Sequence, residues 1–143
     1  MIIGSISENK DYEKRISITP EIAKKYISNG FEVFVEKNLA SHLGISDSEF
    51  TKQGCKVESR ENVLTKSDVI LQLNLPDEKS TSLLKQNNIL IGNFNLTSNK
   101  DNILKISNKN ISVFSMELLP RITRAQSMDI LSSQANLAGY KAV

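Results

Sequence analysis

The sequence predicts an α/β fold, with a mostly parallel sheet and helices on both of its faces. Short apolar runs alternate with segments of helical pattern along the 143 residues, and this alternation is typical of βαβ units. No internal repeat or low-complexity linker interrupts it. Because such crossovers are right-handed, successive helices cover both faces of the sheet. The expected architecture is therefore a three-layer lobe of the flavodoxin-like or Rossmann-like kind.

The first elements have the clearest boundaries. Residues 2–6 form an apolar run that predicts the first strand. The Thr-Pro-Glu run at 19–21 predicts a helix start, because a hydroxyl N-cap, a proline in the first turn and an early acid all favour one. Gly30 is placed to end that helix. Residues 31–35 predict the second strand.

The later elements are shorter. Ser46 and Glu49 form a capping-box pattern, which predicts a short helix. A further helix is predicted around residues 101–106. The remaining strands are predicted, in order, within residues 54–57, 69–73, 89–91 and 111–114.

Composition excludes several classes of function. The net charge of +2 is small and the basic residues are scattered, so neither nucleic acid nor an anionic membrane is an expected partner. No apolar stretch approaches the roughly 18 residues of a membrane span, and direct membrane insertion is not expected. With a single cysteine and no signal-peptide pattern, a reducing, cytoplasmic setting is expected.

Two isolated residues carry little chemical signal. Cys55 follows Gly54 and precedes an apolar position, and we interpret it as a small buried hydrophobe rather than a nucleophile. His42 has no partner implied by its neighbours, so a solvated or locally hydrogen-bonded imidazole is favoured over a catalytic one. No metal site is expected, since one histidine and one cysteine make no cluster of soft ligands.

The segment from Pro120 to Val143 differs from the rest of the chain. Most of its positions are small or polar, with two arginines and a glutamine close together. Read as one helix from about residue 123, it has an apolar face made of Ala125, Met128, Leu131, Ala135 and Ala138. A second face carries Gln126, Asp129 and Ser132 or Ser133, because spacings of three and four are neighbours on a helix. Arg121 lies just before it.

This second face offers an amide, a carboxylate and a hydroxyl in one row. Such a set can hold a polar, planar ligand with donor and acceptor edges, for instance a carboxamide or a ribose. The simpler interpretation is that Asp129 and Ser132 are exposed or cap neighbouring loops. The helix has no stop signal before the sequence ends, so we expect residues 123–143 to connect the lobe of residues 1–122 to a further domain.

Two other features bear on ligands. Nothing matches GxGxxG or a Walker A loop, so this chain is not expected to hold a dinucleotide by itself. Arg15 lies in the polar loop after the first strand, where α/β proteins place ligand contacts. A weak surface ion pair is an equally good explanation for Arg15.

Both ends of the chain resemble one known family, the N-terminal part of the alpha subunit of proton-translocating NAD(P) transhydrogenase, a relative of alanine dehydrogenase. At the start, the resemblance is carried by Ile3-Gly4, the Glu-Lys-Arg run at 13–15 and the Ile-Thr-Pro run at 18–20. At the end it is carried by PRITRAQSMD at 120–129, then by residues 131–133 and 135–140. The second set is highly specific to transhydrogenase.

The resemblance implies roles for particular residues. Arg121, Asp129 and Ser132 would address the carboxamide of NAD(H), and Gln126 would bind the nicotinamide ribose and orient the ring for hydride transfer to NADP on another domain. A Rossmann domain that follows would bind the rest of NAD(H). The resemblance also implies a homodimer, partnership with NADP(H)-binding and membrane components, and a cytoplasmic location peripheral to the inner membrane.

Two positions separate the chain from alanine dehydrogenase. Asn74 stands where that enzyme has a substrate-binding lysine, and Asn95 stands where it has a catalytic histidine. Neither asparagine can anchor a carboxylate as a cation or act as an acid or base, which implies a structural role for Arg15. Two alternatives remain: the substrate domain of an alanine-dehydrogenase-like enzyme, and a non-catalytic α/β module that serves only as a subunit contact.

Overall fold

A computed structural model describes residues 1–142 and shows one six-stranded, all-parallel sheet. The strand order is β3-β2-β1-β4-β5-β6, so the order reverses between β1 and β4. The strands are β1 (Ile2–Ser5), β2 (Glu32–Glu36), β3 (Lys56–Glu58), β4 (Val69–Leu71), β5 (Ile89–Gly92) and β6 (Ser112–Ser115).

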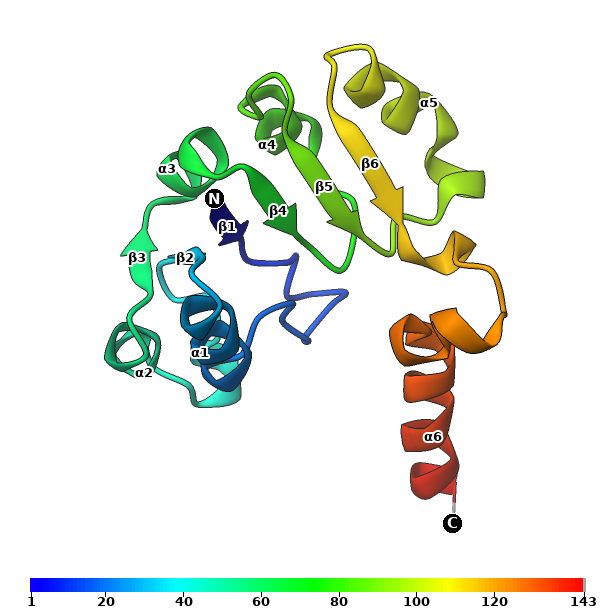
Figure 1. Cartoon of the computed structure of the whole chain (residues 1–143), viewed down its shortest axis with the longest axis horizontal. Helices are drawn as coiled ribbons and strands as arrows, with labels where there is room; N and C mark the ends of the chain where they lie inside the picture. Colours follow the sequence, from blue (N-terminus) through cyan, green and yellow to red (C-terminus); the bar gives the residue numbers. More distant parts are fainter. Residues whose placement is uncertain (143) are drawn as a thin grey trace.

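Helices connect the strands and follow the last one. The α-helices are α1 (Pro20–Ser28), α2 (Asp47–Lys52), α3 (Arg60–Lys66), α4 (Glu78–Ser82), α5 (Leu96–Ser107) and α6 (Ile130–Ala142). Three short 3₁₀ helices are η1 (Ser41–Leu43), η2 (Met116–Leu118) and η3 (Thr123–Met128). In Figure 1, α3, α4 and α5 lie along one side of the sheet, and α1 and α2 lie on the other.

Helices α1 and α2 cover the β3-β2-β1 half of their face. Ala23 of α1 and Phe50 of α2 are fully buried and pack in one cluster with Val33 and Val35 of β2. Helix α1 begins as the sequence predicts, because the Thr19 hydroxyl accepts a hydrogen bond from the Ile22 amide. This packing fixes the loop after β1 against the sheet.

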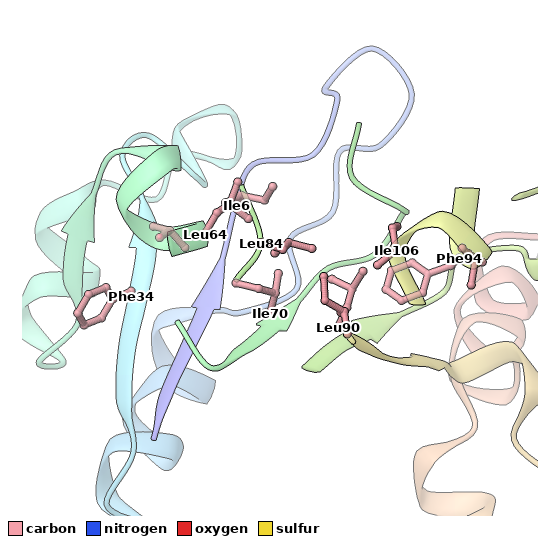
Figure 2. Close-up of a cluster of buried hydrophobic side chains, with 11 residues drawn as sticks. Ile6, Phe34, Leu64, Ile70, Leu84, Leu90, Phe94 and Ile106 are labelled. Atoms are coloured by element: carbon pink, nitrogen blue, oxygen red, sulfur yellow. The ribbon is translucent and has the colours of Figure 1, made fainter. Parts of the chain in front are cut away.

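Helices α3, α4 and α5 cover the opposite face. Leu64 of α3, Leu84 after α4 and Ile106 of α5 pack with Ile70 and Leu90 from the centre of the sheet. Figure 2 shows these side chains converging in one continuous layer. Ile3, Ile70 and Leu90 are buried, as expected for the central strands of a parallel sheet that helices cover.

The predicted fold class and all six predicted strand regions are confirmed, with ends that differ by a few residues. Helices α3 and α4 were not predicted, because seven and five residues are too few to show a helical period. Ser46 precedes α2 as expected, but its hydroxyl bonds the Ser48 hydroxyl and does not cap the helix.

The prediction of one continuous helix from residue 123 is wrong. The 3₁₀ helix η3 ends at Met128, and Asp129 adopts an extended conformation (φ −75°, ψ 100°) before α6 begins. The predicted apolar face is also not buried in this chain, apart from Ala125. Val143, the last residue of the predicted connecting helix, lies outside the described residues.

Helix α6 extends away from the sheet (Figure 1). None of its described residues is buried. Leu137 and Tyr140 are 62% and 80% exposed. A short helix with apolar side chains in water is marginally stable by itself, so α6 has a surface suited to packing against another domain.

Candidate functional site

The segment after β6 forms a pocket of about 380 Å³, at the lower end of the range for small-molecule sites. All four sequence-predicted site residues line it: Arg121, Gln126, Asp129 and Ser132. Its apolar walls include Leu119, Pro120, Ile122, Ala125, Leu131 and Ala135. The structure therefore brings the predicted residues together, although they do not form one row on one helix.

Asp129 and Ser132 are bonded to each other at the start of α6. Asp129 Oδ1 accepts hydrogen bonds from the amides of Leu131 (2.9 Å) and Ser132 (3.3 Å), while Oδ2 accepts one from the Ser132 hydroxyl at 2.7 Å. Asp129 therefore caps α6 itself, whereas the simpler interpretation of the sequence had these residues exposed or capping neighbouring loops. The Ser132 hydroxyl and these two amides lower the pKa of Asp129, and the positive charge of Arg121 acts in the same direction.

Asp129 and Ser132, which both line the pocket, can still accept hydrogen bonds from a ligand. Asp129 Oδ2 accepts one hydrogen bond, from the Ser132 hydroxyl, and can accept a second. The Ser132 oxygen can also accept a hydrogen bond. Arg121 and Gln126 are exposed, and among residues 1–142 their side chains make no hydrogen bond. A guanidinium fork and a primary amide are thus available to a ligand.

Together these groups suit a neutral carboxamide beside a hydroxylated ring. A carboxamide presents an NH₂ donor, which Asp129 can accept, and a carbonyl, to which Arg121 can donate. Gln126 can donate to one hydroxyl and accept from another. The set therefore suits a planar ligand that carries a carboxamide and neighbouring hydroxyl groups.

Glu117, which sequence reasoning missed, ties this segment to the body of the fold. Its Oε2 accepts from the Phe94 amide at 3.2 Å, and its Oε1 accepts from the Leu96 amide at 2.9 Å and the Ser115 hydroxyl at 2.7 Å. Burial opposes ionisation of Glu117, but these hydrogen bonds outweigh it and lower its pKa. An acid shortly after a predicted strand was the available signal.

The crevice at the carboxyl ends of β1 and β4 is a cavity of about 750 Å³ lined mainly by polar side chains, among them Glu8, Arg60 and Gln72. Such a reversal of strand order is the usual ligand site in a sheet of this kind. Here the Glu36 carboxylate accepts from the Ser7 amide at 2.6 Å and from Arg60 Nε at 3.2 Å. Arg60 also donates to the Ser7 carbonyl at 2.7 Å. With no glycine-rich turn present, this crevice offers no phosphate cradle.

Glu8 connects the loop after β1 to the residues that follow β4. Its Oε1 accepts from the Leu73 amide at 2.7 Å, and its Oε2 accepts from Asn74 Nδ2 at 3.2 Å. Asn74 and Asn95 line one cavity between α4 and α5, so the two positions that depart from alanine dehydrogenase face a common space. Both are amides, and neither supplies a positive charge there.

Arg15 is paired with Glu13, which lines the crevice cavity together with Asn74. Its Nη2 and Nε lie 2.6 and 2.9 Å from the two Glu13 oxygens. The Arg15 guanidinium holds the pKa of Glu13 at about 2. His42 Nε2 lies 2.7 Å from the Lys14 carbonyl oxygen, in line with a locally hydrogen-bonded imidazole. Cys55 is buried, and desolvation raises its pKa to about 11.

Within residues 1–142, no three histidine, cysteine or acidic side chains come together as metal ligands. None of the described helices has both the length and the apolarity required to cross a bilayer.

These features define a doubly wound α/β domain with a polar cavity at the usual crevice and a second polar pocket after the last strand. Residues 4–138 match the family model described as alanine dehydrogenase/PNT, N-terminal domain. The chain belongs to this family.

Several relatives are similar over the whole chain. An NAD(P) transhydrogenase subunit alpha polypeptide from Rhodospirillum rubrum is 38% identical over 149 residues, which cover 100% of this chain and 39% of that protein. Its counterpart from Rickettsia prowazekii is 38% identical over 148 residues, with the same coverage. Alanine dehydrogenase 1 from Staphylococcus aureus is 27% identical over 141 residues, covering 99% of this chain and 37% of the enzyme.

The fold is similar to that of a solved structure. The transhydrogenase from Sinorhizobium meliloti superposes with a TM-score of 0.93 at 37% identity, over 99% of this chain and 42% of that one. An L-alanine dehydrogenase shares the fold at a TM-score of 0.76 and 19% identity, over 82% of this chain and 32% of that one. This chain spans about two fifths of the length of the transhydrogenase relatives described above.

Proposed function

We propose that this chain is the first lobe of the NAD(H)-binding component of a proton-translocating NAD(P) transhydrogenase. The observation that carries the proposal is the pocket on residues 119–135, which gathers a guanidinium, an amide, a carboxylate and a hydroxyl around a space of nicotinamide size. Two relatives that are 38% identical to the chain carry the transhydrogenase name. In this proposal, residues 123–143 connect the lobe to a dinucleotide-binding domain.

In this proposal, the residues of the pocket bind the nicotinamide and its ribose and orient the ring. Arg121 donates to the carboxamide oxygen, while Asp129 and Ser132 receive its NH₂ group. Gln126 holds the ribose hydroxyls and thereby sets the rotation of the ring. When bound, the nicotinamide supplies the hydride chemistry itself, so the protein contributes position and electrostatics. A misplacement of about 1 Å costs on the order of 100-fold in rate.

The proposal includes partners and a location. The hydride acceptor, NADP, belongs to a separate NADP(H)-binding component, and proton flow belongs to membrane components. The exposed side chains of α6 are suited to contacts within a homodimer or with the following domain. We place this lobe in the cytoplasm, at the surface of the inner membrane through its partners. By itself, it should bind NADH very weakly, since most of the cofactor would have no site here.

Replacing Gln126 tests the function directly. In the longer polypeptide, reconstituted with the NADP(H)-binding component, Gln126→Asn keeps the amide but shortens its reach by one methylene. We expect hydride transfer from NADH to fall by about 100-fold, while NADH affinity changes little. Stopped-flow absorbance measures transfer, and calorimetry measures affinity.

A matched control uses the same substitution elsewhere. Gln86 lies in the exposed turn before β5, at the amino ends of the strands, whereas the pocket follows the carboxyl end of β6. Gln86→Asn should leave both values unchanged. Normal transfer in Gln126→Asn would remove the role assigned to Gln126.

The alanine dehydrogenase alternative makes a separate prediction. Asn74 is engaged with Glu8 and Arg15 with Glu13, so a substrate carboxylate meets no free cation at these positions. We therefore expect no deamination of alanine by the longer polypeptide, which the initial rate of NADH production reports.

A further inference from the structure

We propose that Glu117 is the positioning residue of the pocket: its carboxylate holds the segment carrying Arg121 and Gln126 in a fixed place relative to α5. The inference rests on the proposed function, because this placement affects hydride transfer only if the pocket receives a nicotinamide. The geometry itself is independent of any ligand.

The start of α5 is a rigid anchor. Phe94 is fully buried, and its carbonyl accepts a hydrogen bond from Asn99 Nδ2 at 2.8 Å. The Asn93 amide donates to the Leu73 carbonyl at 2.9 Å. Gly92 has no space for a side chain, because a Cβ there would collide with the Gln72 carbonyl and the Phe94 ring. The amides of Phe94 and Leu96 are therefore held in place by the core.

Glu117 connects this anchor to the exit from β6. Its two oxygens accept hydrogen bonds from the Phe94 and Leu96 amides at the start of α5. A negative charge is favoured at this end of a helix. The Ser115 hydroxyl donates to Oε1 and restricts the rotation of the side chain. Three hydrogen bonds to one ionised group are stronger than three neutral ones.

Beyond Glu117, the chain has few other polar connections to the sheet. Among the hydrogen bonds of residues 1–142, the only one between residues 118–142 and the preceding body is from the Leu119 amide to the Met116 carbonyl, at 3.2 Å. Of the residues between Leu118 and Met128, only Ala125 is buried. The placement of Arg121 and Gln126 thus depends on the carboxylate of one nearby residue.

A distance measurement between two spin labels tests this inference on the 143-residue chain. Labels at Asp101→Cys on α5 and Ser127→Cys on η3 are both at exposed positions, while Cys55 is buried and should remain unlabelled. With Glu117 present we expect a single narrow distance. In Glu117→Gln the amide NH₂ cannot accept a hydrogen bond, so at least one of the bonds to the start of α5 is lost. We therefore expect a broader distribution of distances between the two labels.

Two further variants complete the test. Ser115→Ala removes one of the three hydrogen bonds and should broaden the distribution less, and it replaces Glu117→Gln if that variant does not fold. Glu49→Gln, an exposed acid of α2, should change nothing. A distribution that stays narrow in folded Glu117→Gln, or in Ser115→Ala where only that variant folds, would overturn the inference.

The readout separates this inference from the proposed function, because no cofactor is added. A chain that loses the narrow distance in Glu117→Gln supports the positioning role whether or not it binds NADH. A longer polypeptide that binds no NADH would refute the proposed function and leave the positioning role of Glu117 standing.

Discussion

The Ser132 hydroxyl donates a 2.7 Å hydrogen bond to Asp129, so two residues expected to face a ligand are joined at the start of α6. The same carboxylate accepts from the Leu131 and Ser132 amides. Helix initiation and the pocket therefore share one side chain, and a ligand that contacts Asp129 meets a group already oriented by the backbone.

The first prediction separates the two roles of Asp129. Asp129→Ala removes the N-cap and should fray the first turn of α6, whereas Asp129→Asn should retain it, because its amide oxygen can accept the two backbone hydrogen bonds that Oδ1 accepts. Amide hydrogen exchange across residues 130–134 measures the fraying. Equal exchange in Asn and Ala variants would show that the charge, not the cap, stabilises the turn.

The same cap has a defined pH dependence. The pKa of Asp129 is lowered in the folded chain, so its contribution is fully present above the ordinary aspartate value. This contribution to the stability of the first turn of α6 is lost as the pH falls through the lowered pKa of Asp129. The protection factors of the first turn of α6, corrected for the intrinsic pH dependence of exchange, should therefore fall only in acid, and Asp129→Asn should abolish that fall.

The second prediction concerns Arg15, for which we predict a structural role. Arg15→Gln removes the charge that holds the pKa of Glu13 at about 2, and that pKa should return toward 4.5. The stability that this pair contributes is present above pH 4.5 and is lost as the pH falls toward 2. An NMR titration of the Glu13 carboxyl measures the shift, with Lys14→Gln as the neighbouring control.

The effect of Arg15→Gln on the pocket of residues 119–135 can be predicted as well. Arg15 lines a different cavity from Arg121 and Gln126, so Arg15→Gln should leave nicotinamide contacts unchanged. Loss of those contacts would assign Arg15 to the ligand site.

The third prediction tests the rigidity of the anchor before α5. Gly92→Ala places a methyl group against the Gln72 carbonyl and the Phe94 ring, and should lower the free energy of unfolding by about 1–3 kcal/mol. Gly139→Ala, where a Cβ meets nothing within 4 Å, should be neutral or stabilising by up to about 1 kcal/mol. Urea unfolding followed by circular dichroism compares them, and equal stabilities would contradict the tight packing at Gly92.

Much of the fold follows from local patterns. The Thr19-Pro20 start of α1 and the apolar runs of the sheet are encoded by neighbouring residues. Helices α3 and α4 are too short to show a period and are stabilised by burial of Val63 and Leu84. The break at Asp129 was missed because the sequence pattern of residues 123–142 fits one helix, while Asp129 is a better cap than interior residue.

The candidate site, like the fold, could be predicted only in part from the sequence. Its residue types were readable from the sequence, because Arg121, Gln126, Asp129 and Ser132 lie within twelve positions of one another. The connection of Glu117 to Phe94 and Leu96 spans more than twenty residues and depends on the pairing of β5 with β6. No local pattern reports such a contact.

The most direct measurement is to map the two halves of NADH separately onto the 143-residue chain by NMR. Reduced nicotinamide mononucleotide carries the carboxamide and its ribose, and AMP serves as the matched control without them. We predict that the first probe, at millimolar concentration, shifts the signals of Arg121, Gln126, Asp129 and Ser132, while AMP leaves these signals unchanged. Shifts centred instead on Ser7 and Arg60, or equal shifts from both probes, would contradict the assignment of this pocket to nicotinamide.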